Sequence, residues 1–429
     1  MTTKAKPWPR DIVRALHHRN FRLFFVGQTI SLVGTWMQRI AVGWLVYRLT
    51  DSAFLLGVVG FAGQIPVFVL APLAGVLADR WDRHRLLILT QVLAMLQAFV
   101  LSFLVLTGTV MIWHIIVLSL VLGVVSAFDI PVRQAFMIEM IEDKSDLGNA
   151  IALNSSMVNA ARLLGPSAAG LLIATLGEGM CFLVNGLSYV AVIASLLMMT
   201  VSHETVWDQG LKAWHDLREG LAYVYGFEPI RAIILLLALA SLMGMPYVAL
   251  MPIFAKDVLH GGPSALGFLM GASGVGALGG ALYLAARRSA LGLGLLIPLA
   301  AATFGIALIG FAFSRNFLLS LLLMSAVGFG QMVQLAGSNT LLQTMVDDRQ
   351  RGRVMGFFTL AFVGMAPVGT LLAGALASVI GAPWTLFIGG IACLVGAGVF
   401  ARRLPRLREK ARPVYIHKGI LPGVGPEID

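Results

Sequence analysis

Long runs of apolar residues, separated by short polar segments, constrain this chain more than any other feature of its sequence. About twenty apolar residues are enough to cross a bilayer as one helix. Only 12% of the 429 residues are charged, against roughly a quarter in a soluble domain, which needs a polar exterior. The sequence therefore predicts an integral membrane protein of helices alone. We place twelve spans, at 21–48, 53–78, 85–107, 112–138, 149–175, 180–200, 230–255, 264–286, 291–312, 317–343, 354–378 and 384–401.

The formal net charge of +10 is better explained by membrane topology than by nucleic-acid binding. With the N-terminus in the cytoplasm, 25 of the 31 Lys and Arg residues fall on the cytoplasmic side of these spans. That asymmetry is the positive-inside rule. We therefore expect both termini in the cytoplasm and no nucleic-acid partner.

The segment 201–229 is the only long polar interruption, and it divides the spans into six and six. Apolar residues recur in it at helical spacing, which favours an amphipathic helix on the membrane surface; a simple tether between the halves is the alternative. The predicted organisation is an N-terminal six-helix bundle at 1–200, a cytoplasmic linker at 201–229, a C-terminal six-helix bundle at 230–401 and a cytoplasmic tail at 402–429.

Two short stretches repeat at one offset. "MIEDKSDLG" at 140–148 corresponds to "MVDDRQRG" at 345–352, and "AGVLADRWDR", which ends at Arg83, corresponds to "GGALYLAARR", which ends at Arg288, both 205 residues apart. Matches at the same places in the span order indicate a duplicated six-span unit. Parallel halves with a substrate site between them are typical of one large class of secondary transporters. We expect twelve transmembrane helices in two pseudo-symmetric six-helix bundles.

The stretch "GVLADRWDRHR" at 75–85 resembles the loop signature between the second and third spans of the major facilitator superfamily. "GTWMQRIAVGWLVYRLT", "AFDIPVRQAF", "DLGNAIALNS" and "RLLGPSAAGLL" extend the resemblance to the enterobactin-exporter-like, or transmembrane secretion effector, branch. The resemblance implies a monomeric, proton-coupled exporter in a bacterial-type cytoplasmic membrane, with no cofactor and membrane lipids as its surroundings.

The resemblance also assigns roles within the charged loop. Gly75, Asp79, Arg80 and Arg83 match the signature and are expected to form a conformational latch, in which Asp79 meets the N-terminal end of the eleventh span while the cytoplasmic side is closed. A carboxylate at a helix N-terminus gains roughly 0.3–1 kcal/mol, and up to about 2 when partly buried. The alternative is a row of charges that only sets topology.

A second charged group lies near the cytoplasmic end of the fourth span. Asp129 and Arg133 are four residues apart and therefore face the same way, with Glu139 further along. Charges near membrane depth usually pair or line a water-filled path. We expect a relay for coupling, with Arg80 or Arg83 pairing with Asp129; an internal salt bridge at the membrane edge is the alternative.

Polar residues inside the spans are candidates for the translocation path. They recur every three or four residues, so each set lies on one helix face. The predicted substrate residues are Gln28, Thr35, Gln38, Arg39, Asn159, Arg162, Gln331 and Gln334. The neutral ones could instead join neighbouring helices. An arginine at mid-bilayer costs roughly 2.5–3.5 kcal/mol, so we expect Arg39 and Arg162 to face a central cavity.

The sequence contains neither a phosphate-binding Gly-x-x-x-x-Gly-Lys-Ser/Thr loop nor a His-Glu-x-x-His or paired Cys-x-x-Cys pattern, and no carboxylate near the middle of a span. We expect no enzyme activity and no metal. Two arginines without a mid-membrane acid favour a small, amphiphilic, anionic cargo of siderophore type. A multidrug efflux pump for lipophilic compounds and a lysophospholipid translocator are the alternatives.

Overall fold

The computed structural model describes residues 13–200, 213–287, 289 and 291–418. At 71–73, 75–80, 213–218 and 348–349 it describes the backbone but not the side chains. The chain forms two compact units. Unit 1 contains residues 1–209 and 252–271, and unit 2 contains residues 210–251 and 272–429. The segment 252–271, which the span order assigns to the C-terminal half, thus packs with the N-terminal half.

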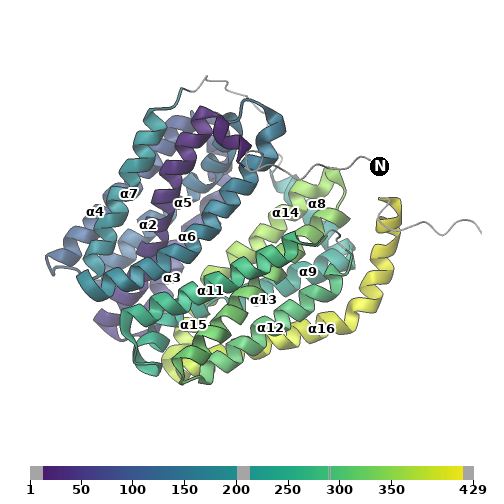
Figure 1. Cartoon of the computed structure of the whole chain (residues 1–429). Coiled ribbons are helices and arrows are strands. Elements are labelled where there is room, and N and C mark those ends of the chain that lie inside the picture. The colour runs from purple at the N-terminus through teal and green to yellow at the C-terminus, as the bar shows by residue number, and fades with distance from the viewer. Residues whose placement is uncertain (1–12, 201–212, 288, 290, 419–429) are drawn as a thin grey trace, which may run out of the picture. The chain divides into compact units, whose positions relative to one another are not determined.

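Unit 1 consists of six long helices and two short 3-10 turns, η1 (Arg14–His17) and η2 (Lys144–Asp146). The α-helices are α2 (Arg19–Thr50), α3 (Ala53–Arg80), α4 (Arg83–Leu106), α5 (Ile112–Glu139), α6 (Leu147–Leu176) and α7 (Glu178–Leu197). In Figure 1 α7 lies between α4 and α2, and it packs against both of them. The π-helical turn η4 (Phe254–Val258) belongs to this unit.

Unit 2 begins with α8 (Ala213–Gly226), a short helix in the predicted linker whose Gly220 lies against Phe357 and Arg353. Two of its long segments are interrupted by π-helical turns, η3 (Ala240–Gly244) and η5 (Leu360–Gly364). The remaining α-helices are α9 (Glu228–Leu239), α10 (Tyr247–Ile253), α11 (Gly262–Ala285), α12 (Leu293–Phe313), α13 (Phe317–Met345), α14 (Asp348–Thr359), α15 (Met365–Ile380) and α16 (Ala382–His417). The end of α10 and the first part of α11 lie in the segment 252–271 and so belong to unit 1.

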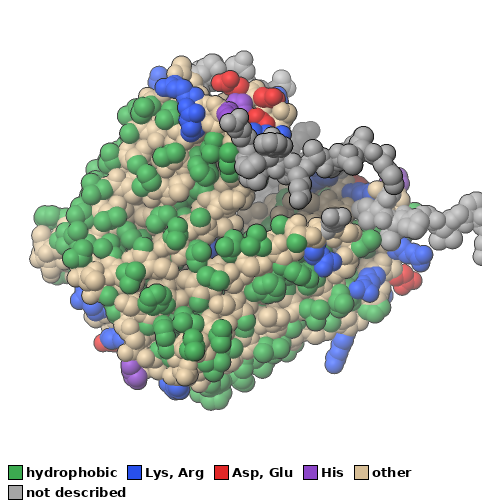
Figure 2. Space-filling model, in the orientation of Figure 1, with side chains coloured by type: hydrophobic (Ala, Val, Ile, Leu, Met, Phe, Trp, Pro, Cys, Tyr) green, Lys and Arg blue, Asp and Glu red, His purple; other side chains and the backbone are tan. Residues whose placement is uncertain are grey.

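Eleven helical segments of the described chain are long and apolar enough to cross a membrane. The twelfth long helix, α2, has 32 residues and falls short in hydropathy because Gln28, Gln38 and Arg39 lie along it. Large apolar side chains are exposed on the helix flanks, for example Phe103 at 65% and Leu318 at 67%, and they dominate the flanks visible in Figure 2. Such surfaces suit lipid rather than water, so the predicted all-helical membrane fold is confirmed.

The duplicated helix order is also visible in the structure. Helix α5 begins at Ile112 and α13 at Phe317, the predicted 205 residues apart. Gly177 follows α6 with φ +82°, and Gly381 follows α15 with φ +86°. Both positions require the positive φ that glycine adopts without steric cost. The two halves therefore repeat one helix order and one way of ending a helix.

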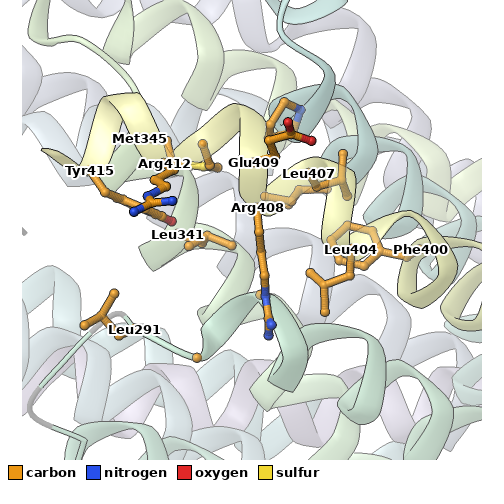
Figure 3. Close-up of a pocket in the computed structure, with 15 residues that line it drawn as sticks. Leu291, Leu341, Met345, Phe400, Leu404, Leu407, Arg408, Glu409, Arg412 and Tyr415 are labelled. Carbon is orange, nitrogen blue, oxygen red and sulfur yellow. The ribbon is translucent and has the colours of Figure 1, made fainter. Parts of the chain in front are cut away.

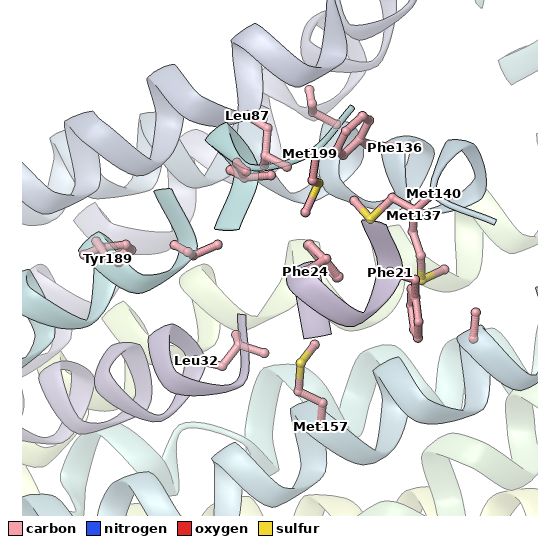
Figure 4. Close-up of a cluster of buried hydrophobic side chains, with 14 of the residues drawn as sticks. Phe21, Phe24, Leu32, Leu87, Phe136, Met137, Met140, Met157, Tyr189 and Met199 are labelled. Atoms are coloured by element: carbon pink, nitrogen blue, oxygen red, sulfur yellow. The ribbon is translucent and has the colours of Figure 1, made fainter. Parts of the chain in front are cut away.

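Each unit has its own apolar core. The core of unit 1 is formed by residues from five helices, among them Phe21 on α2, Leu87 on α4, Phe136 on α5, Met157 on α6 and Tyr189 on α7 (Figure 4). The core of unit 2 is formed by residues from α9, α12, α13 and α16. Polar side chains that lie between these helices are therefore held in fixed positions by close packing.

Candidate functional site

Two arginines of unit 1 share one tryptophan ring. The Cζ atoms of Arg39 and Arg162 lie 4.9 and 5.2 Å from the centroid of the Trp36 ring. Trp36 and Arg39 are neighbours on one face of α2, and Arg162 comes from α6, which packs against α2. The ring attracts the charge of each guanidinium group. We call these three residues the arginine–tryptophan cluster.

The arginine–tryptophan cluster lies deep in its helices. Arg39 is eleven residues before the end of α2, about 16 Å at 1.5 Å per residue, and Arg162 is near the middle of α6. The Arg39 side chain is exposed, the charges of Arg162 and Arg133 act on it, and no carboxylate of the described residues forms an ion pair with it. Exposed charge at this depth requires a water-filled path. The cluster can therefore hold an anion.

Two further predicted residues lie one helical turn from the cluster. Thr35, four residues before Arg39, has its Oγ1 atom 3.3 Å from the Tyr189 hydroxyl. Asn159, three residues before Arg162, donates a hydrogen bond to the Ser155 carbonyl at 2.9 Å. Both side chains are only half-buried. They extend the polar surface of the cluster along α2 and α6.

Gln28 and Gln38 lie in packed interior rather than on accessible surface, contrary to the expectation of a cavity position. Gln38 is 2% exposed; it donates to Gln97 Oε1 at 2.9 Å and accepts from Asn185 Nδ2 at 2.7 Å. These bonds connect α2 with α4 and α7, which is the role of interhelical polar contacts in membranes. Gln28 is 3% exposed, and its Oε1 atom has no hydrogen-bond partner in the described structure.

The predicted residues of the C-terminal half lie beside the π-helical turns of unit 2. Gln331 and Gln334 line a cavity of about 10 Å³ together with residues of η3 and η5. The Ser241 hydroxyl of η3 donates to the Phe362 carbonyl of η5 at 2.5 Å, and Tyr247 donates to Gln331 Oε1 at 3.5 Å. Single π-helical turns occur frequently at functional sites. This second polar region belongs to unit 2 alone, and its cavity is too small for a cargo.

Asp129 is the centre of a hydrogen-bond network on α5, ten residues before the end of that helix. Its Oδ1 atom accepts from Gln91 at 2.6 Å and from Thr90 at 3.2 Å, and its Oδ2 atom lies 3.5 Å from an Arg133 nitrogen. The Asp129 side chain is 13% exposed. Arg133, the basic residue predicted on the same helix face, thus lies close to Asp129. Thr90 and Gln91 of α4 supply the two neutral hydrogen-bond donors.

Of the two residues predicted to pair with Asp129, Arg83 does not, and the side chain of Arg80 lies outside the described residues. Arg83 forms an ion pair of 2.6 Å with Glu139, the last residue of α5, and not with Asp129. Because Asp129 and Glu139 are ten residues apart on α5, their carboxylates lie at depths that differ by about 15 Å, and only the later one is level with the start of α4. The side chains of Gly75, Asp79 and Arg80 lie outside the described residues, so their proposed latch remains a prediction.

A group of contacts that the sequence did not predict connects α2 to the segment 252–271 within unit 1. Lys256 pairs with Asp51 at 2.5 Å, and the Tyr47 hydroxyl donates to Asp257. Backbone atoms of Gly267 would lie 2.8 Å from a Cβ built on Gly170, so α6 and α11 approach closely there. Lys256 and Asp51 are 205 residues apart in the sequence, and no sequence pattern indicated that they pair.

Within the described part of the chain, no three His, Cys, Asp or Glu residues are placed to hold a metal ion. Two helical units with buried polar networks, and a deep pair of arginines, define the class of secondary transporters with duplicated six-helix halves. The chain belongs to the transmembrane secretion effector family of the major facilitator superfamily: the family model matches residues 13–417.

Two characterised relatives span nearly the whole chain. The staphyloferrin A transporter of Staphylococcus aureus (strain NCTC 8325 / PS 47) is 27% identical over 391 residues, which are 90% of this chain and 97% of that protein. The multidrug efflux pump Tap of Mycolicibacterium fortuitum is 27% identical over 379 residues, 86% of this chain and 92% of the pump. The sequence is similar to both over most of its length.

Solved structures support the fold. A bacterial homologue of the human lysosomal transporter Spinster, in an inward-facing and unoccupied conformation, superposes with a TM-score of 0.70 at 12% identity, covering 92% of this chain and 98% of that one. This likeness concerns the fold alone. The family model and this fold together make the chain a multi-pass transporter of the major facilitator fold.

Proposed function

We propose that this transporter exports a small, amphiphilic, anionic molecule, and that Arg39 and Arg162 bind its anionic group. The observation that carries the proposal is the stacking of both guanidinium groups on Trp36. A charge at membrane depth usually pairs with another charge or lines a water-filled path, and Arg39 has no ion-pair partner among the described residues. An anionic cargo supplies that counterion while it is bound, and Thr35 and Asn159 offer neutral hydrogen bonds beside it.

A siderophore-like cargo is the leading candidate, in keeping with a relative named for transport of staphyloferrin A. The relative named as a multidrug efflux pump supports the second candidate, a set of lipophilic compounds. Recognition of cationic drugs needs an acid in the cargo site. Asp129, the candidate acid on α5, is occupied by Arg133 and two neutral donors, which favours the anion. A lysophospholipid, which combines a phosphate with an acyl chain, is the third candidate.

We infer that export is coupled to protons and that Asp129 carries the coupling. Protonation of Asp129 would remove the charge that holds Arg133 at 3.5 Å, and Arg133 acts electrostatically on Arg39. A proton on Asp129 would thus change the positive potential at the cargo site. Glu139 and Arg83 connect the same helix to the start of α4 at 2.6 Å.

The oligomeric state, the membrane and the topology that we propose are those that the family implies. The protein acts as a monomer in a bacterial cytoplasmic membrane, with both termini in the cytoplasm, with membrane lipids around it and without a cofactor or enzyme activity. Asp79 stabilises the state that is closed to the cytoplasm. Gln331 and Gln334, beside the π-helical turns of unit 2, contribute the polar surface of the C-terminal half.

The experiment is efflux from proteoliposomes that contain the purified protein, with and without an imposed pH gradient. Three cargoes are compared: an anionic siderophore, a cationic dye and a fluorescent lysophospholipid. The proposal expects gradient-stimulated movement of the siderophore alone. Movement of the dye alone favours the multidrug pump, and movement of the lysolipid without regard to the gradient favours lipid translocation; either result overturns the anionic exporter.

A matched pair of variants separates the cargo site from general loss of charge. Arg162→Ala should abolish siderophore efflux, because it removes one of the two guanidinium groups on Trp36. Arg315→Ala removes an exposed arginine from the connection between α12 and α13 and should leave efflux unchanged. Equal effects of the two substitutions would remove Arg162 from the cargo site.

A further inference from the structure

A cavity of about 430 Å³ lies within unit 2, beside the last turns of α16. Its walls are mainly apolar and include Leu291, Leu341, Phe400, Leu404 and Leu407. A volume of this order is within the range of about 300–1,000 Å³ found for small-molecule sites. We call it the C-terminal pocket. It contains none of the residues assigned above to the cargo or to coupling.

The C-terminal pocket lies where helices of unit 2 begin and end. Pro229 is the second residue of α9, Leu291 comes two residues before α12, and Met345 is the last residue of α13, and all three line it. Helix α16 has 36 residues, about 54 Å at 1.5 Å per residue, which exceeds the roughly 30 Å of a bilayer core. Its last turns therefore extend beyond the hydrocarbon region, and the pocket lies at the boundary between acyl chains and headgroups.

The basic residues of the last turns of α16 divide into two groups. Lys410 and Arg406 lie 2.6 and 4.0 Å from the Glu228 carboxylate. Arg408 and Arg412, four residues apart on one face, line the pocket and have no ion-pair or hydrogen-bond partner in the described part of the chain. Two uncompensated positive charges at the edge of an apolar cavity match a ligand with an acyl chain and an anionic head.

Figure 3 shows how the charged side chains of the C-terminal pocket are oriented. Arg408 extends from α16 toward the level of Leu291 and Leu404, and Arg412 lies beside Tyr415 one turn further on. The Glu409 carboxylate points the other way from Arg408 in this view. Long arginine side chains at a membrane boundary commonly place their stems on apolar surface and their guanidinium groups in the headgroup region.

We propose that the C-terminal pocket binds one anionic phospholipid of the surrounding membrane, with an acyl chain between Leu341 and Leu404 and the phosphate on Arg408 and Arg412. Basic pockets between transmembrane helices on the cytoplasmic side are known places for anionic headgroups. The pocket would thereby tie the extension of α16 to the ends of α9, α12 and α13. This site is independent of the cargo and of the direction of transport.

Native mass spectrometry of the detergent-purified full-length protein tests the proposal. Phosphatidylglycerol and phosphatidylcholine with the same acyl chains are added in equal amounts. We expect one phosphatidylglycerol per chain, retained at least tenfold more than phosphatidylcholine, and loss of this preference in R408Q/R412Q. Glycerol phosphate, which has the anionic head without a chain, should not compete. Equal retention of both lipids, or full competition by glycerol phosphate, would overturn the proposal.

Two control variants distinguish the pocket from diffuse surface charge. R402Q/R403Q removes two exposed arginines of the same helix that do not line the pocket, and it should keep the lipid. Gly294→Leu keeps every charge, but a Cβ at this position starts 3.4 Å from Leu404 Cδ1 and the longer side chain enters the cavity, so lipid should be lost. If R402Q/R403Q loses lipid as R408Q/R412Q does, or if Gly294→Leu retains it, the pocket is not the site.

Discussion

Replacing Gln38 by leucine tests whether this buried amide joins helices or meets the cargo. The substitution removes two interhelical hydrogen bonds, of 2.9 Å to Gln97 and 2.7 Å from Asn185. Such bonds in membrane proteins average about 0.6 kcal/mol and reach about 1.7, and a buried polar group left unsatisfied costs about 1–3 kcal/mol. We therefore expect the free energy of unfolding to fall by about 1–3 kcal/mol.

The assay is SDS-induced unfolding of the purified protein in mixed micelles, followed by tryptophan fluorescence, together with cargo binding at a concentration where the variant is folded. Gln64→Leu is the matched control, because the exposed Gln64 amide bonds only the Gly60 carbonyl of its own helix, and its effect should stay within about 0.5 kcal/mol. Unchanged stability of Gln38→Leu with loss of cargo binding would refute the packing role and return Gln38 to the cargo site.

Three further substitutions give distinct outcomes. Trp36→Leu removes the ring shared by the two arginines and should weaken binding of an anionic cargo roughly tenfold, as measured by fluorescence titration; unchanged affinity would mean that the ring does not organise the site. Asp129→Asn should make efflux insensitive to an imposed pH gradient in proteoliposomes, and a normal gradient response would move coupling elsewhere. Asp79→Asn should slow efflux without lowering the yield of folded protein, because a carboxylate at a helix N-terminus is worth up to about 2 kcal/mol; an unaltered rate would eliminate the latch.

The helices were predictable because lipid imposes one length on them. The run from Ile112 was predicted to end at residue 138, and α5 ends at Glu139. The apolar run from residue 317 placed the start of α13 correctly, and the cost of a mid-bilayer arginine singled out Arg39 and Arg162. Trp36 was missed, although an aromatic residue three positions before an arginine on one helix is a signal of such stacking.

The sequence did not predict which face of each helix packs against the other helices. Lipid tails are as apolar as a packed core, so an apolar pattern does not show which face of α2 meets lipid and which meets α4 and α7. Gln38 and Arg39 are adjacent in sequence, yet one is buried between helices and the other is exposed. The same lack of register information led to the prediction of Asp129, rather than Glu139, as a partner of Arg83. No residue pattern marked the π-helical turns beside Gln331.

The central claim, that the arginine–tryptophan cluster binds an anionic cargo, is tested most directly by calorimetric titration of the purified protein with an anionic siderophore and with its neutral ester. We expect R39Q/R162Q to lose at least tenfold in affinity for the anion, about 1.4 kcal/mol or more, and little for the ester, while Arg315→Gln binds both as the unaltered protein does. Undiminished affinity of R39Q/R162Q for the anion would contradict the account.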